Sequence, residues 1–452
     1  MQSDVKTAQS IAEKVRDIGG RVYYVGGYVR DLVMGRGSDD VDIEVHGITP
    51  DQLEEILDSI GERIEIGISF GIYGLKGCSL DIAMPRTEDA TGRGHRDFKV
   101  FVDPFLGTKK AAERRDFTVN SLMMDVLSGE IIDHFGGLAD IKSRILRHVN
   151  DIKFAEDPLR VMRAAQFAAR LNFSIADETK DLMSGMDLSA LAKERVFDEL
   201  NKALLHADKP SVFFETMREL GQLNDWFPEM IPLIGLEQDE RFHPEGTVWD
   251  HTMLVLDEAA ALRGEAEYPL GLMYSALTHD LGKAVTTELI NGHIHTYNHD
   301  IEGIPIAEKF MLRLTSDKDL IKYVLNMVEL HMRPNLMASQ QSGTKAMNRL
   351  FDSSVSPEDL ILIAKADCLG CGRDLRASFK RNSDFLNDHL KVFREIMSKP
   401  YVKGSDLVNA GIEPGPDFKD ILDYAHKLRL ADIDKESALK QTVAYARKLR
   451  KQ

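Results

Sequence analysis

The sequence predicts an α+β protein, with a small mixed sheet near its N-terminus and helices through the rest of the chain. Two observations lead to this fold class. Residues 41–45 and the start of 80–84 alternate apolar and acidic side chains, which is typical of half-buried strands. After about residue 138, apolar side chains recur at helical spacing instead. With 452 residues, 43% of them hydrophobic, the chain is long enough to build several cores.

The predicted elements follow one another simply. Helical spacing over residues 8–18 ends at a glycine pair, and a β-rich run over 21–25 ends at a second pair, Gly26-Gly27. A strand over 41–45, an amphipathic helix over 51–59 and a strand over 80–84 complete the first region.

Helices dominate the remainder. We expect them over 158–171, 190–205 and 210–220, before a linker marked by Pro228, Pro232 and Gly235. Two more helical regions follow, the last interrupted at 411–416. These changes divide the chain into four candidate domains: residues 1–137, 138–235, 236–375 and 376–452.

Carboxylates and glycines in the first region form a candidate catalytic constellation. Asp40 and Asp42 are two residues apart in a predicted strand, so both side chains leave the same face. Parallel carboxylates are costly without a cation, and a hard divalent ion is the natural one. With Asp81 from a second strand, they can hold two Mg²⁺ ions that activate a 3′-hydroxyl and stabilise a leaving pyrophosphate. Gly26-Gly27 lets the backbone approach a phosphate closely. Considered alone, Gly26-Gly27 could equally form an ordinary turn without a ligand, and the aspartates could equally be exposed side chains on edge strands.

Histidines cluster in the third region. Seven of the fourteen lie between His243 and His331. Neutral imidazoles together with carboxylates bind transition metals, and an adjacent His-Asp pair can supply two ligands. The ordered set that fits such a site is His251, His279, Asp280, His299, His331 and Asp367.

Five blocks stand in order over about 200 residues. They are Gly26-Gly27-Tyr28-Val29-Arg30-Asp31, Asp40-Val41-Asp42, Arg114-Arg115-Asp116-Phe117-Thr118-Val119-Asn120-Ser121-Leu122, Glu156-Asp157-Pro158-Leu159-Arg160-Val161-Met162-Arg163 and Glu194-Arg195-Val196-Phe197-Asp198-Glu199. This order resembles the tRNA nucleotidyltransferase and bacterial poly(A) polymerase family, class II of the polymerase-β-like superfamily. The resemblance implies a nucleotidyltransferase head over 1–137 and a helical neck for base recognition and RNA binding over 138–235.

The resemblance also implies roles for single residues. Asp40, Asp42 and Asp81 would bind Mg²⁺, and Asp157 and Arg160 would read the incoming base, with Arg163 close by. Spacing supports the base-reading pair, because Asp157 before Pro158 fits a helix N-cap and residues three apart share a helix face. The triphosphate and ribose would be lined by Gly26, Gly27, Arg30, Arg115, Asp116 and Asn120.

The polymer made depends on smaller features. Poly(A) polymerases of this family usually carry a basic residue beside a glycine before the third carboxylate, whereas Gly67 here has isoleucine on both sides. The resemblance therefore favours CCA addition to tRNA with CTP and ATP. A mobile basic loop over residues 86–98 would suit a switch between the two nucleotides. Poly(A) polymerases and enzymes that add only CC or only A remain alternatives.

The histidine region resembles an HD-superfamily phosphohydrolase domain over residues 236–375, as in the longer, multifunctional type of CCA enzyme. Its four defining ligands would be His251, His279, Asp280 and Asp367, with His299 and His331 completing a second metal site. The resemblance implies hydrolysis of phosphate esters, including 2′,3′-cyclic phosphates, with Mn, Ni, Co or Mg. The alternative is an inactive domain kept for tRNA docking. His243, His293 and His295 are expected at the surface or supporting the ligands.

The remaining features bound the protein class. The net charge of −16 disfavours an overall nucleic-acid binder, but residues 84–115 (8 − 5 = +3) and 141–170 (7 − 3 = +4) are locally basic. The pair Cys368 and Cys371, with Cys78 elsewhere, supplies too few ligands for a structural zinc, so we expect a structural role. No apolar run suggests a membrane span, and the start does not resemble a signal peptide. We expect a cytoplasmic monomer or homodimer whose last domain, 376–452, is a helical tail of unassigned role.

Two readings from other classes stay open. The chain could act mainly as an HD phosphohydrolase with a regulatory nucleotide-binding head, or as an RNA-binding module without catalysis. The intact set of Asp40, Asp42 and Asp81 speaks against both.

Overall fold

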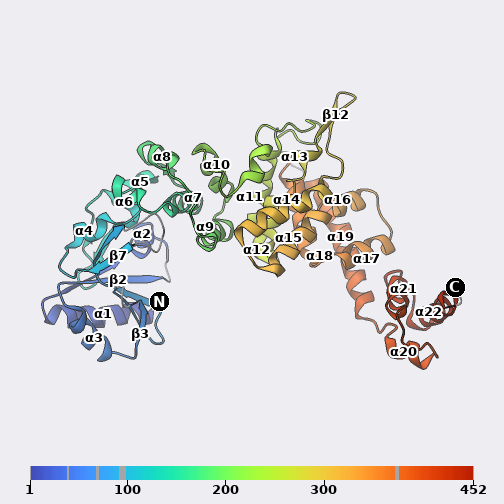
Figure 1. The fold of residues 1–452 in the computed structure, drawn as a ribbon, viewed down its shortest axis with the longest axis horizontal. Coiled ribbons are helices and arrows are strands. Elements are labelled where there is room, and N and C mark those ends of the chain that lie inside the picture. Colours follow the sequence, from blue (N-terminus) through green and yellow to red (C-terminus); the bar gives the residue numbers. More distant parts are fainter. Residues whose placement is uncertain (1, 38–39, 68–70, 91–97, 372–375, 451–452) are drawn as a thin grey trace. The chain divides into compact units, whose positions relative to one another are not determined.

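The computed structural model describes residues 2–37, 40–67, 71–90, 98–371 and 376–450. The chain forms two compact units: Met1–Ala207 with Val212–Trp226, and Asp208–Ser211 with Phe227–Gln452. The first unit mixes sheet and helices and the second is mainly helical, as Figure 1 shows. The predicted α+β class is confirmed, and the finer division into four domains stays a prediction.

A mixed sheet forms the centre of the first unit. Among the described residues it has seven strands, in the order β3-β4-β5-β2-β1-β8-β9. The pair β2–β5 is parallel, and the other neighbours are antiparallel. The strands are β1 (Arg21–Val25), β2 (Val41–His46), β3 (Arg63–Gly67), β4 (Ile72–Leu75), β5 (Leu80–Ala83), β8 (Met123–Asp125) and β9 (Ile131–Ile132).

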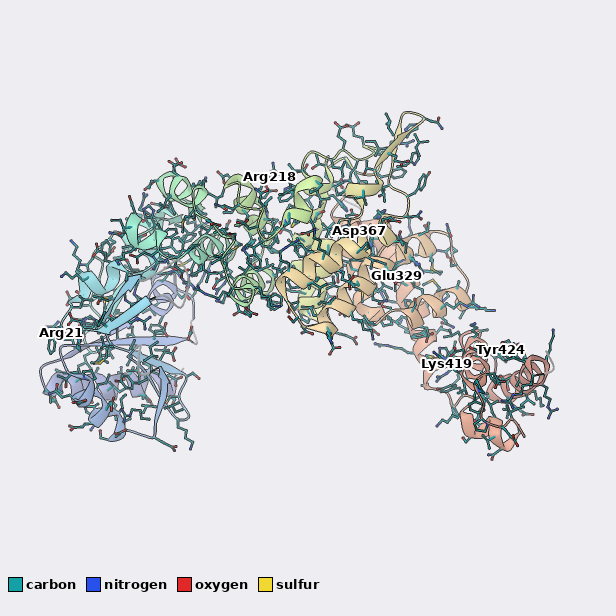
Figure 2. The ribbon with its side chains drawn as sticks, in the orientation of Figure 1. Arg21, Arg218, Glu329, Asp367, Lys419 and Tyr424 are labelled. Carbon is teal, nitrogen blue, oxygen red and sulfur yellow. The ribbon has the colours of Figure 1, made fainter. Side chains whose placement is uncertain are left out.

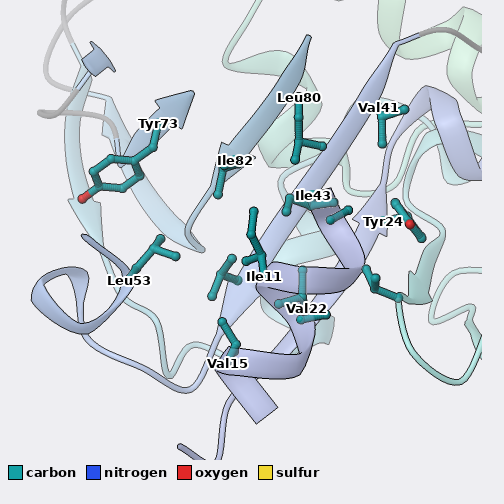
Figure 3. Packing of buried hydrophobic residues seen from close by; sticks show 14 of the residues in the cluster. Ile11, Val15, Val22, Tyr24, Val41, Ile43, Leu53, Tyr73, Leu80 and Ile82 are labelled. Carbon is teal, nitrogen blue, oxygen red and sulfur yellow. The ribbon is translucent and has the colours of Figure 1, made fainter. Parts of the chain in front are cut away.

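One face of this sheet carries the core. Val41, Ile43 and Val45 of β2 are fully buried, and they pack with Ile11 from α1 (Gln2–Asp17) and Leu53 from α3 (Pro50–Asp58). Figure 3 shows this packing around Ile43 and Ile11. Because side chains alternate along a strand, the acidic residues of β2 are turned to the opposite face.

Helices and two short strand pairs complete the first unit. The helix α7 packs against α9, and β6 pairs with β7 as an antiparallel hairpin. The elements are α2 (Gly27–Val33), β6 (Arg86–Ala90), β7 (Phe98–Val102), α4 (Thr108–Glu113), η2 (Thr118–Asn120), α5 (Gly137–Ser143), β10 (Ile145–Leu146), α6 (Asp151–Ala155), α7 (Leu159–Leu171), β11 (Ser174–Ile175), α8 (Asp177–Ser184), α9 (Lys193–His206) and α10 (Ser211–Glu219).

The second unit consists mainly of packed helices. Contacts join α11 to α12 and α18, α12 to α15 and α18, and α14 to α15. A separate apolar cluster, which includes Leu407, Ile421 and Ala438, holds α20, α21 and α22 together. No helix of the described residues is long and apolar enough to cross a membrane.

The bounds of the second unit's elements are η3 (Pro228–Leu233), α11 (Val248–Leu262), η4 (Arg263–Glu265), α12 (Pro269–Thr278), α13 (Lys283–Thr286), β12 (Glu288–Ile290), β13 (His293–His295), α14 (His299–Leu314), α15 (Lys318–Leu330), α16 (Met332–Ser339), α17 (Thr344–Ser353), α18 (Pro357–Leu369), α19 (Arg376–Ser398), α20 (Gly404–Asn409), α21 (Phe418–Leu430) and α22 (Lys435–Leu449).

Several sequence expectations need correction. The expected linker at Pro228 and Pro232 is a 3₁₀ helix, whose Met230 and Leu233 are buried. Parts of the expected loop over 86–98 are the strands β6 and β7, while residues 91–97 lie outside the described residues. The helical regions also contain the small strand pairs β10–β11 and β12–β13, which are too short to give a sequence period.

Candidate active site and metal centre

Three predicted carboxylates lie at one place on the sheet. The parallel register of β2 and β5 sets Asp42 directly opposite Asp81, and Asp40 precedes Asp42 by two residues. Asp40 and Asp81 are exposed, whereas Asp42 is half-buried. The alternation that buries Val41 and Ile43 therefore turns these acids away from the core.

The electrostatics of Asp42 reflect this crowding. Burial raises the pKa of Asp42 to about 6, and the negative charges of Asp40 and Asp81 add to the rise, against the opposing charge of Arg115. Such a shift marks a carboxylate that is costly to ionise without a cation. Among the described residues, the groups of His, Cys, Asp and Glu side chains whose possible metal-binding atoms lie within 4.8 Å of one another are all in the second unit. The carboxylates of Asp40, Asp42 and Asp81 are therefore not yet gathered at ligand distance from one another. The exposed side chains of Asp40 and Asp81 can close on an ion by rotamer changes.

A cavity of about 410 Å³ opens beside the carboxylates. Gly26, at the turn from β1 into α2, has φ 67°, which a side chain would disfavour. A Cβ there would lie 3.1 Å from Nη1 of Arg115. The lining residues are Gly26, Gly27, Tyr28, Arg30, Asp31, Asp40, Asp42, Arg115, Asp116, Asn120, Arg163, Gln166, Phe167, Arg170 and Lys202.

Hydrogen bonds fix the basic groups of this cavity. Arg30 Nη1 donates to Asn120 Oδ1 at 2.7 Å, and Asn120 Nδ2 donates to Asp116 Oδ1 at 3.0 Å. Arg163 Nε donates to the other Asp116 oxygen at 2.8 Å. Burial alone would raise the pKa of Asp116, but the charge of Arg163 and the bond from Asn120 hold it below its usual value. The network holds guanidinium groups at the wall of a cavity whose size and charge suit a polyphosphate.

The predicted base-reading pair lies elsewhere in the first unit. Asp157 and Arg160 are not among the cavity's lining residues. Arg160 donates to the carbonyl oxygens of Lys153, at 3.0 Å, and Arg114, at 2.7 Å, while Asp157 pairs with Arg195 at 3.0 Å. The helix begins at Leu159, one residue later than expected, although Asp157 still accepts a hydrogen bond from the Leu159 amide at 3.1 Å. Base reading by this pair therefore stays a prediction.

Sequence reasoning missed Phe167 and Arg170 among the residues of the cavity. Both lie on one face of α7 with Arg163, which was expected near the nucleotide, and this helical spacing was a usable signal. Arg30 and Arg163 both lie over the Phe167 ring, 5.2 and 5.3 Å from its centre. Gln166 Nε2 is buried without a hydrogen-bond partner among the described residues, so a ligand in the cavity can accept its protons.

Glu44 is a further residue that sequence reasoning missed, and it lies on the same face of β2 as Asp42. It is 1% exposed, accepts a bond from His46 at 2.8 Å, and lies 3.4 Å from Arg114 and 3.8 Å from Arg115. Burial alone would raise the pKa of Glu44, but His46 and the two arginines lower it to about 2. Glu44 is therefore a buried counter-charge that holds the two arginines near the carboxylates.

Glu44→Gln is expected to lower the free energy of unfolding by about 2 kcal/mol at neutral pH, because it leaves partly buried arginines without their counter-charge. The stability from a lowered carboxyl pKa is present above the unfolded pKa, near 4.5, and is lost as pH falls toward about 2. Urea unfolding at about pH 7 and about pH 3 should therefore show a difference from wild type that shrinks in acid. A difference independent of pH would contradict this role.

The histidine set of the second unit also converges. Nε2 of His299 lies 3.3 Å from Asp280 Oδ1, and Nε2 of His279 lies 3.2 Å from Asp280 Oδ2. Nε2 of His251 lies 3.1 Å from Oδ1 of Asp367, which is on α18 and labelled in Figure 2. The ligand-type groups form two neighbouring clusters: His251, His279 and Asp367, and Asp280, His299 and His331.

In three of these imidazole rings, the nitrogen that faces away from the carboxylates is held by a hydrogen bond to the backbone. Nδ1 of His279, His299 and His331 donates to carbonyl oxygens three residues earlier, at 2.8, 2.8 and 2.7 Å. A carbonyl only accepts, so in the neutral ring Nε2 keeps its lone pair. Burial and the nearby His279 lower the pKa of His331 to about 4, which keeps that ring neutral. His279 Nε2 is buried and makes no hydrogen bond among the described residues, so the donor set fits a bound metal.

Comparisons with known proteins identify the family of the chain. The Poly A polymerase head domain family matches residues 22–147, and the family described as the probable RNA and SrmB-binding site of polymerase A matches residues 172–234. The chain is 36% identical to the multifunctional CCA protein of Actinobacillus pleuropneumoniae serotype 5b, over 77% of this chain and 85% of that protein. It is 32% identical to that of Acinetobacter baumannii strain AYE, over 88% and 98%.

Solved structures share the fold. The Bacillus stearothermophilus CCA-adding enzyme in complex with CTP has a TM-score of 0.68 at 21% identity, covering 100% of both chains. The Thermotoga maritima CCA-adding enzyme complexed with tRNA has a TM-score of 0.64 at 20% identity, covering 97% of this chain and 95% of that one. From its head-domain match and its identity to curated relatives over most of its length, the chain belongs to the multifunctional CCA protein family and is a nucleotidyltransferase.

Proposed function

We propose that this enzyme adds CCA to the 3′ end of tRNA, using CTP and ATP and no nucleic-acid template. The observation that carries the proposal is the register of β2 and β5, which sets Asp42 opposite Asp81 beside an arginine-lined cavity. The printed names of the relatives support CCA as the added sequence, and the tRNA and CTP complexes of proteins with this fold support the substrates.

The residues of the first unit divide the work. Asp40, Asp42 and Asp81 would hold Mg²⁺, which when bound lowers the pKa of the attacking 3′-hydroxyl and neutralises the leaving pyrophosphate. Arg30, Arg115 and Arg163 line the cavity and would bind the triphosphate. Asp116 and Asn120 orient the guanidinium groups of Arg163 and Arg30, and Gly26 leaves room for the chain to pass close to a ligand. Positioning and charge neutralisation are the main requirements of phosphoryl-type transfer.

Single-nucleotide assays test this proposal. A tRNA lacking its CCA end, incubated with labelled CTP alone and then with ATP, should take up C and then A. Uptake of C alone, or of A alone on a CC-ended tRNA, would identify an enzyme that adds only part of CCA. Long A tails on other RNA acceptors would identify a poly(A) polymerase and overturn the proposal.

Magnesium binding to the first unit should depend on pH. Asp42 binds a cation only when ionised, and its pKa is about 6. Burial and its acidic neighbours favour its protonated form, so Mg²⁺ affinity should fall by up to about tenfold for each pH unit below about 6 and level off above it. Mg²⁺ titrations of nucleotide binding between about pH 5 and pH 8 measure this, with Asp42→Asn as the variant that loses the dependence. Constant affinity across that range would contradict it.

We also propose that the second unit is a metal-dependent phosphohydrolase that acts on phosphate monoesters and 2′,3′-cyclic phosphates. His251, His279, Asp280 and Asp367 would hold a divalent ion such as Mn²⁺, Ni²⁺, Co²⁺ or Mg²⁺, with His299 and His331 serving a second one. A bound ion would supply hydroxide from water near neutral pH.

Lys283 Nζ lies 2.7 Å from Asp280 and 2.8 Å from the Gln238 side-chain oxygen, so a fixed positive charge faces the centre. Phosphate release with each metal in turn tests the activity, and its absence with all four would favour a domain kept for tRNA docking.

A further inference from the structure

A second cluster of ligand-type side chains adjoins the histidine centre. His243, Glu245, His251 and Cys371 each offer an atom within 4.8 Å of the others. His243 and Glu245 precede α11, His251 lies on it, and Cys371 follows α18, which packs against α11. Neither proposed activity uses His243, Glu245 or Cys371.

His251 belongs to both clusters through different nitrogens. Its Nε2 lies 3.1 Å from Asp367 Oδ1, in the centre already described. Its Nδ1 lies 2.8 Å from Oε1 of Glu245, which also receives His243 Nδ1 at 2.8 Å. The imidazole therefore stands between two groups of ligands.

Two buried atoms of the second cluster lack aligned partners. The His251 and Glu245 side chains are 0% and 2% exposed. Nδ1 of His251 approaches Glu245 closely but not in hydrogen-bond alignment, and Oε2 of Glu245 has no hydrogen-bond partner among the described residues. Buried polar atoms are normally satisfied, so two buried atoms without hydrogen-bond partners in one group of ligand-type side chains indicate a ligand.

The donor set indicates which ligand. One thiol, two imidazoles and one carboxylate match the ligands and the coordination number of four that zinc prefers, whereas Mg²⁺ and Ca²⁺ prefer oxygen alone. We propose that His243, Glu245, His251 and Cys371 bind a Zn²⁺ ion at a site separate from the HD centre and sharing only His251 with it.

Protons must leave when zinc binds. Cys371 loses its S–H proton to solvent and coordinates as thiolate, while His251 coordinates through Nδ1 and keeps its Nε2 proton toward Asp367. Filling the HD centre as well requires Nε2 to lose its proton too, because the ring then lies between two cations. Occupancy of one site should therefore weaken binding at the other.

Cobalt spectroscopy tests the site on the full chain. Metal-free protein titrated with Co²⁺ should show a near-ultraviolet thiolate-to-cobalt charge-transfer band, which added Zn²⁺ removes. Cys371→Ser should abolish the band. Cys368→Ser, which changes the other thiol of the same C-x-x-C, is the matched control and should keep it. His279→Ala should also keep it, since that residue belongs to the HD centre alone, so the result does not depend on the phosphohydrolase activity.

Two results would overturn the proposal: no such band in the wild-type protein, or a band that survives Cys371→Ser. If the Cys371→Ser variant does not fold, an alkylation experiment on the wild-type chain still tests the proposal. Zn²⁺ should protect Cys371 from alkylation, as mapped by mass spectrometry, and equal labelling with and without Zn²⁺ would mean that Glu245 only orients His251.

Discussion

Replacing Asp42 by alanine is expected to slow nucleotide addition by about 1,000-fold or more, because losing a metal ligand removes several kcal/mol of transition-state stabilisation. Asp42 is the member of the carboxylate set that faces Asp81 across the parallel strands and also lines the arginine-rich cavity. The loss should appear in kcat more than in KM, since the arginines that would bind the triphosphate are untouched. Single-turnover incorporation of labelled C into tRNA lacking its end measures it.

A matched variant separates this effect from misfolding. Asp51→Ala removes an exposed carboxylate from the first turn of α3 in the same unit, away from the cavity lining, and should leave the rate near wild type. Asp42→Ala should also have a free energy of unfolding at least as large as that of wild type, because the substitution removes an ionised carboxylate that is crowded by other negative charges. A rate for Asp42→Ala within about tenfold of wild type would show that Asp42 is not a metal ligand.

The second large effect concerns the other unit. His279→Ala is expected to lower phosphate release by about 1,000-fold or more while CCA addition continues, since the two sets of residues lie in separate units. His279 is 1% exposed, and its Nδ1 bond to Ala276 aims Nε2 at the carboxylates of Asp280 and Asp367. Removing it deletes one ligand and opens a small polar void. Metal content and hydrolysis of a 2′,3′-cyclic nucleotide should fall together.

His293→Ala is the control for this experiment. His293 is an exposed residue of strand β13, outside the metal-ligand groups of the described residues, and its loss should change neither activity. Equal loss of both activities in His279→Ala would indicate unfolding, which circular dichroism detects. Retained phosphate release with retained metal would show that the hydrolytic site lies elsewhere.

Much of the first unit followed from local patterns. The period of two in residues 41–45 predicted both the strand and the common face of Asp40 and Asp42. The sequence could not reveal that β2 and β5 pair in parallel, because register depends on which strands meet in the sheet. It also gave no reason to single out Glu44, whose importance comes from two arginines about 70 residues away that fold against it.

The histidine centre shows the same division. Ligand types and order predicted the set from His251 to Asp367, and the structure brings these residues together. For His279 and His331, the nitrogen that faces the centre depends on a carbonyl of the preceding helical turn, and no residue pattern encodes that. His243 was expected at the surface or in support, and Glu245 went unnoticed, because their proximity to Cys371 arises only when α11 packs on α18.

The pairing of β2 with β5 has a consequence for refolding experiments. A slip by one residue, or a one-residue deletion in either strand, would turn isoleucine and valine toward water and drive the acids into the apolar interior. A misregistered molecule would therefore be both unstable and inert, with no partly working form between. After dilution from denaturant, the recovered rate of nucleotide addition should then be proportional to the fraction of native molecules. It should rise at the same rate as the burial of Ile43 and its neighbours.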